Sequence, residues 1–228
     1  MRIGICSTQC NGKTTLVEAI KAKWPMYKSP EKTYRDIIQE KKLPINRDGT
    51  TESQAIIRDA LFEQAKLTAD EKYCVSDRTI LCNLVYTMYL CDKNRIVEEE
   101  FITESIIMCR ESMKRYDIIF WLPLNEDIVI SDENNPNRDL DDLYRREIDV
   151  LYQTIYKGYL EGSCPFFDPQ DQPAFIALEG SIGEKLATIG QYLGSDGNIL
   201  AEGSILTTME EEFDKLQLMK QLEAELKK

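Results

Sequence analysis

The residues best suited to chemistry lie near the amino terminus, in the segment STQCNGKTT (residues 7–15) that follows a short apolar run. Binding of a polyphosphate needs backbone N–H donors, the positive end of a helix, a lysine for the outer phosphates and a hydroxyl for Mg²⁺. Gly12, Lys13 and Thr14 supply such parts in the required order. The segment departs from the pattern GxxxxGK[ST] at Ser7, which stands in place of the first glycine.

We therefore predict a loop that binds the phosphates of a nucleotide, with Lys13 on the outer phosphates and Thr14 as a ligand of Mg²⁺. The alternative is an exposed turn with an ordinary lysine at a helix start. The residues expected to contact the nucleotide are Thr8, Gln9, Cys10, Asn11, Gly12, Lys13, Thr14 and Thr15.

Such a loop has to be held between a strand and a helix, and the sequence provides both. Short apolar runs typical of buried strands occur at residues 2–6, 72–76, 116–123 and 175–178. Helical patterns lie between these runs, at residues 13–24, 79–91, 99–115 and 140–160, and after the last of them, at residues 182–193. Strands separated by helices of this length favour crossover connections, and thus an α/β fold with a parallel sheet.

The composition excludes several classes of protein. The chain has 228 residues, 43% of them hydrophobic and 30% charged, and no apolar run near the roughly 18 residues of a membrane span. The absence of histidine excludes imidazole base chemistry and histidine-ligated metal sites. A net charge of −12 disfavours non-specific binding to DNA, although a local basic groove stays open.

The seven cysteines include no CxxC pair and lie partly in apolar runs, which favours reduced thiols over disulfides. Because the first residues lack the pattern of a signal peptide, we expect the protein in the cytoplasm, or in the host cytoplasm if it is viral. A turn-rich break at residues 194–198 divides an expected main domain (1–194) from a tail (195–228). The tail carries an amphipathic helical pattern at 207–227, suited either to docking or to pairing in a homo-oligomer.

At this point the chain resembles a known family. The loop at 7–15, the sequence Ser76-Asp77-Arg78-Thr79 after the second strand, and the arginine-bearing stretch 137–146 resemble P-loop kinases of the thymidylate kinase and deoxynucleoside kinase type, with related nicotinamide riboside kinase-like ATPases. The resemblance covers about residues 1–193. It implies a three-layer P-loop kinase-like sandwich, with a five-stranded parallel sheet and helices on both faces, to which the C-terminal helix would be added.

By this resemblance, Lys13, Asp77 and Arg138 would be the catalytic residues. Asp77 would either orient the acceptor hydroxyl or hold Mg²⁺ through water, and Arg78 would contact the acceptor. The alternative for Asp77 is a helix cap ahead of Thr79.

Arg138 lies in a polar, turn-forming segment that could close over the nucleotide as a lid. The helix that follows carries Arg145 and Arg146, which could also reach the transferring phosphoryl group. The alternative is a surface loop whose arginines form salt bridges along the helix, for example with Asp142.

The acceptor site is expected between the first helix and residue 66. The resemblance makes Arg35 a phosphate or sugar contact, and makes Gln54 and Arg58 contacts on the base side. The alternative is that these side chains belong to solvated helix faces.

Together these features predict an ATP- and Mg²⁺-dependent enzyme that moves the γ-phosphoryl group to a nucleoside, a nucleotide or a similar small acceptor. One alternative is a kinase of hydroxymethylated bases, such as 5-hydroxymethyluracil, in viral DNA. A second alternative is a nucleotide-dependent ATPase or switch that binds a protein partner. The choice of acceptor, and of ATP over GTP, stays open.

Overall fold

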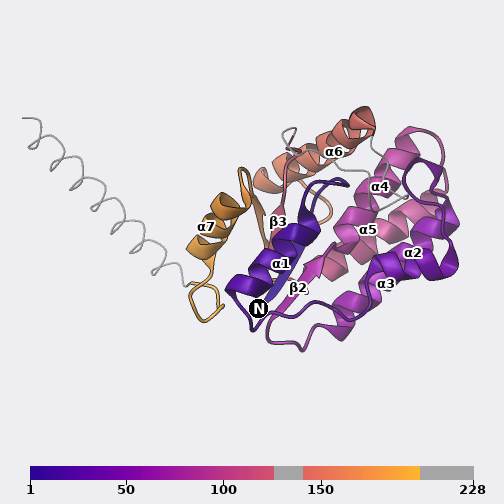
Figure 1. Cartoon of the computed structure of the whole chain (residues 1–228). Helices are drawn as coiled ribbons and strands as arrows, with labels where there is room; N and C mark the ends of the chain where they lie inside the picture. Colours follow the sequence, from indigo (N-terminus) through magenta and orange to yellow (C-terminus); the bar gives the residue numbers. More distant parts are fainter. Residues whose placement is uncertain (126–140, 201–228) are drawn as a thin grey trace, which may run out of the picture.

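A four-stranded parallel sheet forms the centre of the molecule. The structure is a computed structural model that describes residues 1–125 and 141–200 (Figure 1). Its strands are β1 (Arg2–Cys6), β2 (Cys74–Asp77), β3 (Ile118–Trp121) and β4 (Ala174–Ala177), in the spatial order β2-β1-β3-β4. Every neighbouring pair is parallel. The predicted α/β class is confirmed.

The sheet has four strands among the described residues, so the expectation of five strands was wrong. The segment where the chain returns from α1 toward β2 contributes one parallel bridge, between Lys28 and Cys74. Pro25 and Pro30 flank the four residues around this bridge. Proline lacks the N–H that a sheet ladder needs, so the pairing cannot extend in either direction.

Helices cover both faces of the sheet in three layers (Figure 1). One face packs against α1 (Lys13–Lys23) and α7 (Ile182–Tyr192) through a cluster that includes Ile118 and Phe120. The other face packs against α3 (Thr51–Leu67), α4 (Ile80–Asp92), α5 (Glu99–Met113) and α6 (Asp142–Leu160) through a cluster that includes Ile119 and Trp121. This alternation along β3 is the period of two expected when both faces of a sheet are buried.

Most predicted elements lie within two or three residues of the observed ones. The acidic residues Glu99 and Glu100 lie in the first turn of α5, where the helix dipole favours them. The structure adds α2 (Tyr34–Lys41) and a short 3₁₀ turn (Asn46–Asp48), which the sequence analysis did not include. None of the helices in the described part of the chain is both long and apolar enough to cross a bilayer.

Two expected features lie outside the described residues, namely the lid arginine Arg138 and the helix at 207–227. The seven cysteines are all free thiols, four of them buried.

Gly4 of β1 packs tightly against Thr79, the residue before α4, and against Ile119 of β3. A Cβ at this position would lie 2.5 Å from Cγ2 of Thr79 and 2.6 Å from Cδ1 of Ile119. We expect Gly4→Ala to lower the free energy of unfolding by about 1 to 3 kcal/mol, because the interior must shift to admit a methyl group. Urea denaturation followed by circular dichroism measures this change.

Gly183→Ala is the matched control. Gly183 is exposed in the first turn of α7, and the nearest atom to its Cβ position is Oγ of Ser181, 3.9 Å away. This substitution is expected to stabilise the protein by about 0.5 kcal/mol. Equal effects of the two substitutions would contradict the tight packing at Gly4.

Candidate functional site

The predicted phosphate loop joins β1 directly to α1. Cys10 (φ 52°) and Gly12 (φ 79°) adopt the left-handed conformation, and Gly12 is the N-cap of α1. No side chain caps the first N–H groups of α1, and no acidic residue lies in its first turn. Within the described residues, side chains therefore leave the first N–H groups of α1 uncapped, which is the condition that an anion-binding helix start requires.

Lys13 is buried beneath the loop. Its Nζ donates hydrogen bonds to the carbonyl oxygens of Ser7, at 3.2 Å, and Thr8, at 2.5 Å. Burial, together with the nearby cation of Arg78, lowers the pKa of the Lys13 ammonium to about 7. The carbonyls partly solvate this ammonium, and phosphate oxygens would solvate it better.

Asn11 fastens the loop to the end of β3. Its Nδ2 donates to the carbonyl oxygens of Leu122, at 2.9 Å, and Pro123, at 2.8 Å. Its Oδ1 accepts a hydrogen bond from the backbone N–H of Asn125 at 3.1 Å. Asn11 was predicted to contact the nucleotide. In the structure its side chain is hydrogen-bonded to backbone groups at the end of β3, and it anchors the loop there.

Arg145 reaches the same loop from α6. Its Nη2 donates to the carbonyl oxygen of Cys10 at 3.4 Å, and its Nη1 forms an ion pair with Asp142 at 3.1 Å. Arg145 is buried, whereas the neighbouring Arg146 is exposed. Both interpretations of Arg145 therefore have a contact in the structure, one with the loop and one with the predicted salt-bridge partner.

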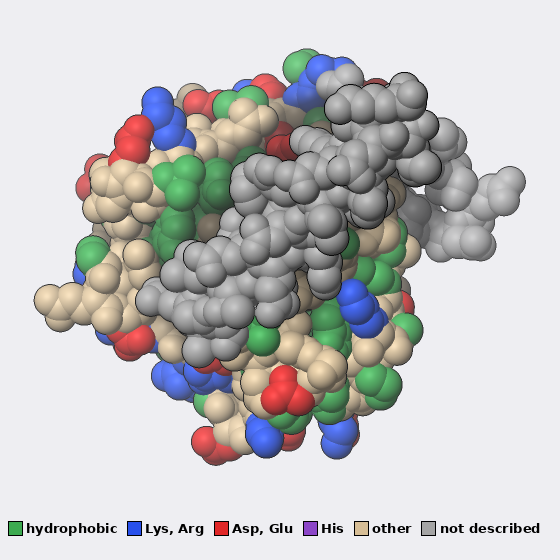
Figure 2. Space-filling view, turned by 90° about the vertical axis from the view of Figure 1, so that its left-hand side faces the viewer, with side chains coloured by type: hydrophobic (Ala, Val, Ile, Leu, Met, Phe, Trp, Pro, Cys, Tyr) green, Lys and Arg blue, Asp and Glu red, His purple; other side chains and the backbone are tan. Residues whose placement is uncertain are grey.

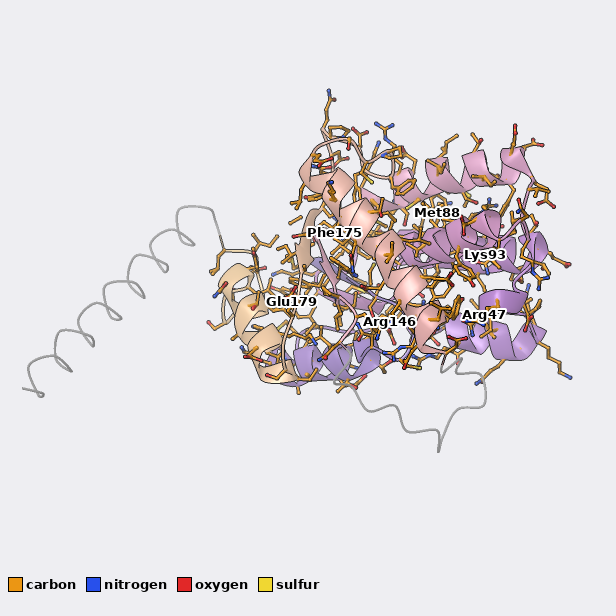
Figure 3. All side chains as sticks on the ribbon, turned by 90° about the horizontal axis from the view of Figure 1, so that it is seen from above. Arg47, Met88, Lys93, Arg146, Phe175 and Glu179 are labelled. Carbon is orange, nitrogen blue, oxygen red and sulfur yellow. The ribbon has the colours of Figure 1, made fainter. Side chains whose placement is uncertain are left out.

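Salt bridges hold the beginning of α6 in place. Arg47 pairs with Asp141, the N-cap of α6, and Lys93 pairs with Glu147 at 2.8 Å. In Figure 3, Arg47 and Lys93 lie together on one side of α6, and Glu179 lies on the other side. These contacts fix the helix that carries Arg145 against α4 and the 3₁₀ turn.

Thr14 and Asp77 meet beside the loop. The register of β1 and β2 pairs Ile5 with Asp77, so the end of β2 lies next to the start of the loop. Oγ1 of Thr14 donates to Oδ2 of Asp77 at 2.7 Å. The N-cap of α4 is Thr79, so the structure does not support the helix-cap alternative for Asp77.

Arg35 completes this contact from α2. Its Nη2 donates to Oγ1 of Thr14 at 3.0 Å and lies 3.7 Å from Oδ2 of Asp77. The other oxygen of Asp77, Oδ1, is buried without a hydrogen-bond partner in the described part of the structure. The predicted lysine, threonine, aspartate and Arg35 therefore come together at the carboxyl end of the sheet, where open α/β sheets bind ligands.

Arg78 is the most unusual residue of the site. Its φ of 99° is in the left-handed region, which is costly for a residue with a Cβ. The guanidinium lies over the ring of Tyr34, 4.6 Å from its centroid, and over the ring of Tyr86, at 5.4 Å. Only 9% of Arg78 is exposed, yet within the described residues it forms no ion pair and its Nε has no hydrogen-bond partner.

The two predicted base contacts, Gln54 and Arg58, are both bonded to other protein side chains. Oε1 of Gln54 accepts a hydrogen bond from Nδ2 of Asn83 at 2.8 Å, so Gln54 belongs to a buried amide pair that joins α3 to α4. The guanidinium of Arg58 pairs with Asp59 at 2.9 Å and Glu104 at 2.8 Å. Arg58 is therefore engaged with the outer helices and not with the loop.

Sequence reasoning left the two rings around Arg78 unassigned. These rings belong to Tyr34, the first residue of α2, and Tyr86, in α4. The one available signal is that both rings are tyrosines, whose hydroxyls need polar partners when buried. Tyr86 finds this partner in Oε1 of Gln9, at 2.7 Å.

A family model described as an AAA domain matches residues 2–161, well over half of the chain. The chain belongs to this AAA domain family. No curated protein matches the chain at the level of sequence.

Solved structures show the same fold in this AAA domain protein and in P-loop kinases. Deoxyadenosine kinase from M. mycoides, solved with dCMP and a flexible dCDP, superposes with a TM-score of 0.61 at 18% identity over 83% of this chain and 96% of its own. Thymidylate kinase from Candida albicans superposes with a TM-score of 0.60 at 13% identity over 88% and 95%. NadR in complex with NR has a TM-score of 0.60 at 12% identity over 88% of this chain and 53% of its own. The expected likeness to P-loop nucleoside and nucleotide kinases is confirmed.

The lowered pKa of Lys13 predicts that nucleotide binding takes up a proton. In the free protein Lys13 is largely neutral above about pH 7, and a bound triphosphate restores its charge by favouring the ammonium. Affinity for a non-hydrolysable ATP analogue should therefore fall as the pH rises from about 7.5 to about 9, by up to tenfold per pH unit. Titration calorimetry in buffers of different ionisation enthalpy measures the uptake.

In Lys13→Ala the proton uptake should disappear together with most of the affinity. Unchanged uptake in this variant would show that another group is the source. An affinity of the unmodified protein that is constant over the same pH range would contradict the placement of Lys13 beneath the loop.

The left-handed backbone of Arg78 predicts steric strain that a glycine at this position would relieve. Glycine adopts positive φ without the steric cost that a Cβ brings. Arg78→Gly should therefore be more stable than Arg78→Ala by about 1 kcal/mol, although both variants lose the guanidinium. Thermal unfolding of the two variants, measured side by side, tests this order. An alanine variant at least as stable as the glycine variant would contradict the strain.

Proposed function

We propose that this protein is an ATP- and Mg²⁺-dependent phosphotransferase that moves the γ-phosphoryl group to a nucleoside, a nucleotide or a similar small acceptor. The proposal rests on one observation. The phosphate loop, Asp77 and Arg78 lie together at one edge of the sheet. A loop alone would suit any nucleotide-binding protein. A buried guanidinium behind the loop, with no acidic partner among the described residues, favours a second ligand next to the first.

The residues at this edge divide into a donor side and an acceptor side. On the donor side, Lys13 and the N–H groups at the start of α1 bind and orient the triphosphate. On the acceptor side, Arg78 and Arg35 hold the acceptor so that its attacking oxygen faces the γ-phosphorus. Positioning and charge neutralisation of this kind are what phosphoryl transfer requires from a protein.

The residues present also fit Mg²⁺. This ion prefers oxygen ligands, usually one or two from the protein in addition to water and phosphate. Thr14 offers a hydroxyl and Asp77 a carboxylate whose Oδ1 is buried without a partner. When bound there, Mg²⁺ would neutralise charge on the phosphates.

The lid arginine remains part of the proposal. Arg138, in the segment between β3 and α6, would contact the transferring phosphoryl group. We also propose that residues 195–228 form a separate unit, which docks on the domain or pairs two copies of the chain.

The solved structures support the choice of acceptor class. Deoxyadenosine kinase and NadR were solved with a nucleotide product and with NR, and thymidylate kinase has the same fold. A small acceptor of this kind suits a site where the guanidinium of Arg78 lies over the rings of Tyr34 and Tyr86.

The DNA alternative finds less support. On the face shown in Figure 2, the described Lys and Arg side chains are scattered among acidic ones and do not gather into a continuous strip. Binding of duplex DNA rests mainly on such basic strips. The ATPase or switch alternative leaves the buried guanidinium of Arg78 without a ligand.

An acceptor panel tests the proposal. With γ-labelled ATP and Mg²⁺, we expect stable transfer of label to at least one nucleoside or nucleotide. Lys13→Ala should reduce this transfer by about a thousandfold or more, because it removes the charge that stabilises the transferring phosphoryl group. Thin-layer chromatography of the products measures both reactions.

Hydroxymethyluracil-containing DNA belongs in the same panel. Label retained on this DNA alone would favour the first alternative. Release of free phosphate at a rate that no acceptor changes would favour the ATPase alternative and overturn the proposal.

A further inference from the structure

A closed ring of contacts joins the phosphate loop to the acceptor side. The ring runs through Gln9, Tyr86, Arg78, Tyr34, Arg35 and Thr14. Its first and last members both belong to the segment 7–15, so the loop itself closes the circle.

Three hydrogen bonds and two contacts between a guanidinium and an aromatic ring make up this circle. The hydroxyl of Tyr86 donates to Oε1 of Gln9 at 2.7 Å, and the Tyr86 ring lies against the guanidinium of Arg78. On the other side, Nε of Arg35 donates to the hydroxyl of Tyr34 at 3.3 Å. The four inner members each contact two neighbours, and the backbone of the loop joins Gln9 to Thr14.

The unpaired polar groups of the ring are hydrogen-bond donors. Nε2 of Gln9 and Nε of Arg78 are both buried without a partner in the described structure. Gln9 is 7% exposed and Arg78 is 9% exposed. Buried donors without partners cost free energy, and the cost is larger where the donor is charged.

We infer that this ring receives a phosphate group of the acceptor, so that the protein phosphorylates a nucleoside monophosphate in preference to the nucleoside. This inference rests on the proposed function and names the acceptor class at the same site. A phosphate offers several acceptor oxygens and negative charge, which matches an unpaired amide N–H group and an unpaired guanidinium N–H group on two residues that both contact Tyr86. A single hydroxyl could satisfy only one of these donors.

Arg78 carries the charge in this recognition, and Gln9 adds a donor from the loop on the other side of their shared contact with Tyr86. Asp77 is engaged elsewhere, since its Oδ2 accepts from Thr14 and lies near Arg35. Within the described residues, no ion pair gives Arg78 a carboxylate in place of the phosphate.

The reaction balances without a general base. A phosphate oxygen of the monophosphate attacks the γ-phosphorus of ATP and forms a P–O–P bond. The bond from the γ-phosphorus to the β,γ-bridging oxygen breaks, and its electron pair leaves with ADP. Because a phosphomonoester has its second pKa near about 6, the attacking oxygen is already deprotonated at neutral pH. A nucleoside hydroxyl would have to lose a proton.

The experiment compares each nucleoside with its own 5′-monophosphate, using the full-length protein, ATP and Mg²⁺. The common ribonucleosides and deoxyribonucleosides form the panel, and nucleoside diphosphate formation is measured. We expect kcat/KM for the best monophosphate to exceed that of its nucleoside by about a hundredfold or more, as charge-assisted hydrogen bonds provide.

Gln9→Glu tests the role of the loop residue with a nearly isosteric change. It keeps the oxygen that accepts from Tyr86 and places an anionic oxygen where the unpaired N–H group lies. We expect KM for the monophosphate to rise by about tenfold or more, with a smaller change for the uncharged nucleoside. Gln191→Glu, an exposed residue of α7, makes the same change of charge and should leave both values unchanged.

The outcomes separate the two proposals. If a nucleoside accepts the phosphoryl group as well as its monophosphate does, the inference falls and the phosphotransferase stands. If no acceptor is labelled while ATP is hydrolysed, the proposed function falls and the inference falls with it. If Gln9→Glu raises KM equally for both members of a pair, Gln9 does not recognise phosphate.

Discussion

The site depends on a buried ammonium group under a loop of carbonyl oxygens. Lys13 belongs to the first turn of α1, so its Cα is fixed by the helix while its Nζ turns back toward Ser7 and Thr8. Removing a charged amine from water costs several kcal/mol unless other polar groups replace the water. Two backbone carbonyls supply part of this replacement. The phosphate oxygens of a bound triphosphate can supply the rest of the solvation that the ammonium group lacks.

The surrounding packing keeps the loop in this conformation. Asn11 ties it to the end of β3, and Arg145 ties Cys10 to α6. Both ties use backbone carbonyls, so they hold the shape of the loop without occupying its N–H groups. A loop held in this way loses little conformational entropy on binding a nucleotide, and less of the binding energy is spent on ordering it.

The sequence predicted the parts of the site that follow from local spacing. Lys13 and Thr14 stand at fixed offsets between a strand and a helix, and Asp77 ends a recognisable strand, so parallel pairing brings them together. Strand number was harder to predict, since Pro25 and Pro30 reduce the expected fifth strand to one bridge. Contacts between helices that are far apart in the sequence could not be predicted either. Nothing in the spacing of Arg58 indicates that Glu104 lies 2.8 Å away.

Arg78 was expected at the acceptor from the resemblance, but its backbone conformation could not be predicted from the sequence. Its left-handed backbone follows from tertiary packing, since β2 ends at Asp77 and α4 is capped by Thr79, so one residue has to make the whole turn between them. Gly4 makes this sharp turn possible, because only a residue without a Cβ lets β1 approach Thr79 so closely. The absence of a methyl group in the central strand thus helps to place a guanidinium at the edge of the sheet. The contact between Gly4 and Thr79 therefore affects both the packing of the core and the position of Arg78 at the edge of the sheet.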